Sequence, residues 1–164
     1  MNTIEYYIVE ILKKAPSKGK VLIITNSSDG WVNSCAKVYY PHLLPILEQI
    51  NIISARELYQ DKFPNEPTTW KVNTFNDLKQ KFHFEKCIVN DIICIGDDNG
   101  EIIVAKKFGE NFENCLVKTI KFRDKPNLID LIKQIFLIND QILRVYNYLK
   151  NLIIQVDKKK NPNN

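Results

Sequence analysis

The chain has 164 residues, of which 45% are hydrophobic and 26% are charged, and its formal net charge is +4. The length predicts one domain of ordinary globular composition. The modest charge and the scarcity of arginine argue against a dedicated nucleic-acid binder, and no apolar stretch approaches the ~20 residues of a membrane-spanning helix.

The start of the chain and its cysteines predict an intracellular, cytoplasmic protein. The segment MNTIEYYIVEILKK has neither a basic leader nor a small-residue cleavage site. The four cysteines form no CxxC pair, and two histidines add little support for a structural zinc site. We therefore expect reduced thiols at Cys35, Cys87, Cys94 and Cys115.

Apolar side chains in residues 3–14 recur on one helical face, and Pro16 ends the run. The short apolar run Val21–Thr25 is typical of a buried parallel strand. The polar turn after it favours a helix over Trp31–Tyr40. A second short helix is expected over Leu43–Ile50.

Two further strands are expected over Ile52–Ser54 and Ile92–Gly96, separated by a helix that Thr68 or Thr69 caps and that continues to about Lys81. A helix over residues 101–108 and a strand over Val117–Phe122 follow. This alternation predicts an α/β fold with a four-stranded, Rossmann-like parallel sheet and helices on both faces.

The last helix is expected to start near Pro126 and to be long. Its apolar positions alternate in steps of three and four, which predicts a helical extension over residues 137–157 that contacts a protein partner or a second copy through residues 140–156. A hairpin at Asn139–Asp140 is the alternative. Residues 1–136 would form the α/β domain and residues 158–164 a disordered tail. The apolar positions are Leu131, Ile135, Ile138, Ile142, Val145, Leu149, Leu152 and Val156.

Two polar positions are candidate contacts for an anion. Thr25-Asn26 closes the first strand, where a hydroxyl and a free N–H could hold a phosphate oxygen; an ordinary turn accounts for the pair as well. Lys71 lies near the start of a helix, where its charge opposes the helix dipole, and this conflict indicates a nearby anion; a solvated lysine is the alternative.

A stronger indication of a ligand site follows the expected strand Ile92–Gly96. Asp97 and Asp98 come directly after it, and Glu101 follows four residues after Asp97. One helical turn could bring these carboxylates together, and they are the hard oxygen ligands that suit Mg²⁺. An acidic turn without a metal is the alternative.

Five segments, taken in order, resemble one eukaryotic subfamily of the haloacid dehalogenase superfamily: VLIITNSSDGWVNSCAKVYYPHLLPIL, IISAR, TTWKVNTF, IICIGDDNGE and VKTIKFRDKPNLIDLIKQI. They carry its TNxxxGW, SAR, WK and GDxxxE patterns, and the similarity covers about residues 20–136. The resemblance implies phosphoryl transfer through an aspartyl phosphate. Thr25 and Asn26 would bind phosphate, Lys71 would neutralise charge, and Asp97 with Asp98 or Glu101 would hold Mg²⁺.

The family's first motif, an Asp-x-Asp at the end of the central strand, is absent. No aspartate precedes Asp29, and Glu5 and Glu10 fall in the expected first helix. We therefore expect a degenerate, non-catalytic domain that acts as a structural or interaction subunit and needs no cofactor. Two alternatives are a magnesium-dependent phosphatase whose nucleophile strand lies on another chain or upstream, and a regulatory module that binds phosphate or Mg²⁺.

A missing central strand would leave two inner edges of the sheet with unpaired backbone groups. Either the flanking strands close up, or another chain adds a strand between them, or a longer native precursor contains that strand.

Overall fold

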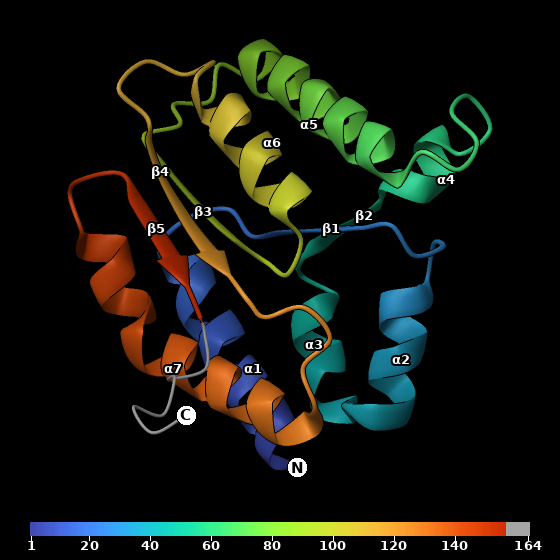
Figure 1. Cartoon of the computed structure of the whole chain (residues 1–164), viewed down its shortest axis with the longest axis vertical. Coiled ribbons are helices and arrows are strands. Elements are labelled where there is room, and N and C mark those ends of the chain that lie inside the picture. The colour runs from blue at the N-terminus through green and yellow to red at the C-terminus, as the bar shows by residue number, and fades with distance from the viewer. Residues whose placement is uncertain (157–164) are drawn as a thin grey trace, which may run out of the picture.

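The computed structural model describes residues 1–156 and shows an α/β fold with two small parallel sheets (Figure 1). In the first sheet, β1 (Leu22–Thr25) pairs with β2 (Asn51–Ser54). In the second, β4 (Leu116–Lys121) lies between β3 (Asp91–Gly96) and β5 (Leu152–Gln155). All paired strands run parallel, so the carboxyl ends of the strands in each sheet lie at the same edge of that sheet.

Seven α-helices connect and cover these strands within the described residues. Four of them begin with a side chain that accepts a hydrogen bond from a backbone N–H, which satisfies one free donor of the first turn; these caps are Asn2, Ser54, Asp98 and Asn127. The helices are α1 (Thr3–Lys14), α2 (Trp31–Tyr39), α3 (Leu44–Leu47), α4 (Ala55–Tyr59), α5 (Pro67–Phe84), α6 (Asn99–Gly109) and α7 (Leu128–Asn147). Two short 3₁₀ turns cover Ala15–Ser17 and Pro41–Leu43.

Helices α5 and α6 cover one face of both sheets. Leu78, Phe82 and Phe108 form a buried cluster there. Side chains from both sheets pack against this cluster, namely Leu22, Ile24, Ile53 and Ile92. One apolar layer therefore extends across β1, β2 and β3.

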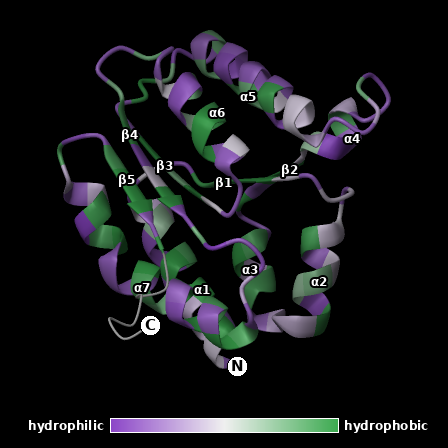
Figure 2. Cartoon of the chain, in the orientation of Figure 1, coloured by the Kyte–Doolittle hydropathy of each residue, from purple (hydrophilic) through white to green (hydrophobic). Residues whose placement is uncertain are grey.

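The opposite face is covered mainly by α1, α3 and α7. Val9 of α1 belongs to a cluster that includes Ile23, whereas Ile11 of α1 packs in a second cluster with Ile93. Helix α1 therefore contacts side chains from both sheets. Figure 2 shows hydrophobic residues along α1 and α7, while α5 is mostly hydrophilic on the side in view.

The prediction of a single four-stranded sheet was wrong in one respect. All four predicted strands form and pair in parallel, but β1 and β3 are not hydrogen-bonded to each other. Within the described residues, β1 pairs only with β2, and β3 pairs only with β4. The first helix is confirmed over Thr3–Lys14, so Glu5 and Glu10 are helical.

The prediction of a helical extension to residue 157 was also wrong. Helix α7 ends at Asn147, Tyr148 is extended, and Leu152–Gln155 forms β5 beside β4. Leu152 and Ile154 pack in the same cluster as Ile142 and Val145, so the chain buries much of the predicted seam itself. The expected tail, residues 158–164, lies outside the described residues.

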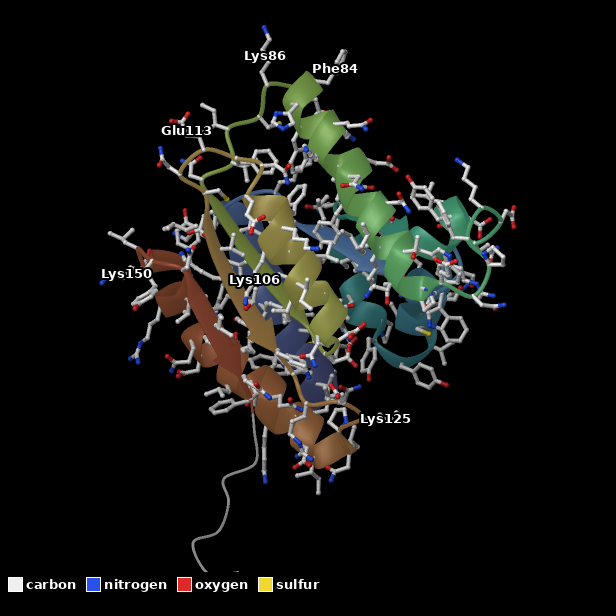
Figure 3. All side chains as sticks on the ribbon, turned by 45° about the horizontal axis from the view of Figure 1, so that its top comes forward. Phe84, Lys86, Lys106, Glu113, Lys125 and Lys150 are labelled. Carbon is white, nitrogen blue, oxygen red and sulfur yellow. The ribbon has the colours of Figure 1, made fainter. Side chains whose placement is uncertain are left out.

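Two further features of the fold are a short helix after β2 and an exposed end of α5. Helix α4 was not predicted; it is five residues long and depends on the Ser54 cap. At the end of α5, Phe84 is 90% exposed and points away from the molecule, as does Lys86 (Figure 3). Within residues 1–156, no helix is both long and apolar enough to cross a membrane.

Candidate functional site

The end of β1 is fixed to the start of α5. The N–H of Ser27 donates to Thr25 Oγ1 at 3.0 Å, which forms a local turn. Asn26 Nδ2 donates to the carbonyl of Pro67, the first residue of α5, at 3.3 Å. Asn26 Oδ1 is buried and accepts no hydrogen bond from any described residue. Among the buried side-chain atoms of the described residues, it is the one at the end of β1 that lacks a hydrogen-bond partner.

Lys71 lies one turn into α5, and its ammonium group binds the carboxylate of Glu101 in the first turn of α6. Both side chains are largely buried, with 11% of Lys71 and 18% of Glu101 exposed. Burial lowers the pKa of Lys71, and the negative charges of Asp98 and Asp97 oppose that shift. The nearby anion that the position of Lys71 indicated is thus a carboxylate of the protein itself.

The predicted metal ligands have other contacts in this structure. Asp98 caps α6, where its Oδ1 accepts from the N–H of Gly100 at 2.9 Å. Glu101 folds back over Gly96 so closely that a Cβ on Gly96 would collide with its carboxylate. No three His, Cys, Asp or Glu side chains within the described residues are grouped as a metal site. Mg²⁺ would therefore compete with Lys71 for Glu101 and with the cap of α6 for Asp98.

The site residues predicted from sequence fall into two groups. Lys71, Asp97, Asp98 and Glu101 come together where α5 and α6 begin, with Cys94 of β3 close enough to act on the charge of Lys71. The hydroxyl of Thr25 accepts from Ser27 in a local turn, and no hydrogen bond or ion pair between described residues links it to Lys71. Asn26 connects the groups indirectly, through the first residue of α5.

A polar cleft of about 260 Å³ lies beside Thr25, at the carboxyl ends of β1 and β2. Gly30 begins α2 at its rim, with a φ of 72° that favours glycine. Ser54 was not predicted as a site residue, although the Ser-Ala-Arg segment contains it. It lines the cleft, and its hydroxyl donates to Ser27 O at 2.7 Å. Other polar residues of the lining are Ser28, Asp29, Asn33 and Glu48.

No protein-family model, curated protein or solved structure matches this chain.

Proposed function

We propose that this chain is a degenerate haloacid dehalogenase-like domain without phosphatase activity, and that it serves as a structural or interaction subunit of a larger assembly. The motif resemblance supports the ancestry. Residues 1–28 contain no aspartate, so they do not supply the carboxylate nucleophile that the covalent route needs at the end of a strand preceding β1.

The pairing of Lys71 with Glu101 is the observation that carries this proposal. A lysine that neutralises a phosphate must present its charge to the ligand. Here that charge is directed to Glu101, and Asp97 and Asp98 add further negative charge around it. A phosphate dianion approaching this group meets more negative than positive charge unless a divalent cation is also bound.

A phosphatase assay tests the proposal. The purified chain is incubated with p-nitrophenyl phosphate, with and without Mg²⁺, beside a matched Asp97→Asn variant. We expect neither protein to exceed the uncatalysed background. Magnesium-dependent turnover that Asp97→Asn abolishes would overturn the proposal.

The alternative is a magnesium-dependent phosphatase whose nucleophile strand comes from another chain or from sequence upstream of Met1. Within residues 1–156, β1 and β3 each pair on one side only. This favours the alternative, because a strand entering between them would end beside Asp97 and Lys71. The same assay on protein isolated from its native cells with its partners still bound distinguishes the two. Activity in that complex, and none in the isolated chain, would favour the alternative.

The earlier expectation that another chain contacts residues 140–156 stays a prediction. Leu149 and Ile153 are the most exposed apolar side chains in that range.

A further inference from the structure

We propose that this chain forms a two-fold symmetric homodimer in which the outer face of α7 packs antiparallel against the same face of a second copy. The inference rests on the proposed role as an interaction subunit and names a second copy of the chain as the partner. The outer face consists of six exposed residues, Ile129, Lys133, Phe136, Leu137, Asp140 and Leu143.

Helix α7 has a buried face and an exposed face. Figure 1 shows it beside α1, in the outer layer on this side of the sheets. The residues on its buried face are Gln134, Ile135, Ile138, Ile142 and Val145. At 3.6 residues per turn, the outer face occupies about a third of the circumference on the opposite side of the helix. A surface helix of a monomer normally carries polar residues on that side.

Four of the six residues on the outer face are instead apolar. Their exposed fractions run from 41% at Leu137 to 64% at Ile129. They recur along about four turns of one side of the helix, so they form a stripe and are not scattered singly over the surface. A contiguous apolar patch that is exposed to water marks a surface for protein interaction.

Aromatic side chains extend this stripe from α7 onto α1. The ring centres of Phe136 and Tyr7 are 5.4 Å apart, and those of Tyr7 and Tyr6 are 5.3 Å apart, both in edge-to-face contact. Tyr6 is exposed as well. Phenylalanine and tyrosine are enriched in protein interfaces, so the row of rings widens the contact surface beyond a single helix.

The two charged residues of the outer face indicate which partner fits. Lys133 and Asp140 carry opposite charges, and neither forms an ion pair with another described residue. They are seven residues apart, and the midpoint between them falls between Phe136 and Leu137. Each charge therefore lies about 5 Å along the helix axis from the centre of the apolar stripe.

A second copy related by a two-fold axis at this midpoint satisfies both charges. The axis reverses the direction of α7, so Lys133 of each chain lies opposite the partner's Asp140, and two ion pairs flank the apolar centre. Such a contact is self-complementary, as a two-fold interface requires. A parallel pair of helices would place Lys133 opposite the partner's Lys133, and like charges disfavour that arrangement. The ion pairs thus set orientation, while the apolar stripe supplies affinity.

Reversal of one charge at a time tests this arrangement by sedimentation of the full chain from about 5 to 500 µM. Because the interface is small, we expect a dimer with a dissociation constant on the order of 10 µM. Lys133→Asp and Asp140→Lys should each raise that constant at least about tenfold, because like charges then meet at both pairs. An equimolar mixture of the two variants should recover association to within about threefold of the wild type, because opposite charges meet again at both pairs.

Matched changes on α6 control for charge and apolar area. Lys106→Asp makes the same change of charge on α6, where Figure 3 labels Lys106, and should leave the dimer unchanged. Leu137→Ala should weaken the dimer at least about threefold, whereas Ile103→Ala, at an exposed position of α6, should not. Thermal unfolding of each variant at about 5 µM checks that the monomer still folds.

Three outcomes would overturn the inference. The first is a wild-type chain that stays monomeric up to about 500 µM. The second is a dimer that neither charge reversal weakens, which would place the contact on another surface. The third is a mixture of the two variants that does not associate better than each variant alone, which would exclude the antiparallel pairing. None of these results changes phosphatase activity, so the assay above tests the proposed function separately.

Discussion

The ammonium group of Lys71 binds the carboxylate of Glu101 and joins α5 to α6 at the carboxyl end of β3. Both groups are largely removed from water, so each depends on the other for compensation of its charge. This ion pair organises the polar group at the candidate site, and it also occupies the lysine that a phosphate would need.

Removing one member of this pair should destabilise the fold. Lys71→Met and Glu101→Gln should each lower the free energy of unfolding by about 1–3 kcal/mol, because each leaves a buried polar partner unsatisfied. The double variant should be less destabilised than the sum of the two. Urea unfolding of the four proteins gives the coupling energy. Additive effects would show that the pair does not form.

Gly96 should tolerate no side chain while Glu101 occupies its present position. Gly96→Ala should lower the free energy of unfolding by about 1–3 kcal/mol, because its Cβ would collide with the carboxylate of Glu101. Gly19→Ala is the matched control, since no atom lies within 4 Å of a Cβ there. In a Glu101→Ala background the cost at Gly96 should largely disappear. An equal cost in both backgrounds would contradict the close approach of Glu101.

Cys94 should make stability depend on pH in the alkaline range. Burial raises the pKa of its thiol from 9.0 to about 11, opposed by the charge of Lys71. Between these values the unfolded state loses its thiol proton while the folded state keeps it, so folding becomes less favourable as pH rises. Relative to Cys94→Ala, the wild-type chain should lose about 1 kcal/mol per pH unit over that interval. A stability difference that stays constant from pH 8 to pH 11 would be the contrary result.

Substitutions at two adjacent residues of β5 should lower the free energy of unfolding by unequal amounts. Ile154 packs against the α7 cluster, whereas Ile153 is 64% exposed. Ile154→Ala should lower the free energy of unfolding by about 1–3 kcal/mol, and Ile153→Ala by less than about 0.5 kcal/mol. Thermal unfolding of the two variants measures the difference. Equal effects would argue against a strand at these positions.

The first four strands and most helices could be predicted because each has a strong local signal. Val21–Thr25 is a continuous apolar run, and residues 3–14 repeat with a helical period before a proline. Helix α4 could not be predicted with the same method, since five residues are too few to show a period.

Strand β5 was missed because its sequence fits two periods. Leu149, Leu152 and Val156 continue the three-and-four spacing of α7, but Leu152, Ile154 and Val156 also alternate as a strand requires. The tertiary structure decides between them. The edge of β4 offers backbone partners to a strand, and a helix there could not use them.

The sequence predicted that Thr25, Lys71 and the acids would share one edge of the sheet, but it did not indicate which of these groups would pair. The resemblance placed Lys71 and the acids at one edge, and the structure brings Lys71 to Asp97, Asp98 and Glu101. Which carboxylate would bind the lysine depends on how α5 and α6 pack, and residue spacing along the chain does not contain that information.

The parallel strands form two sheets that are not hydrogen-bonded to each other between β1 and β3. NMR contacts between backbone protons of neighbouring strands in the free, full-length chain test it most directly. We predict such contacts between β1 and β2 and between β3 and β4, and none between residues 22–25 and residues 91–96. Regular backbone contacts between β1 and β3 would show that the two strands have closed together, and would contradict the account.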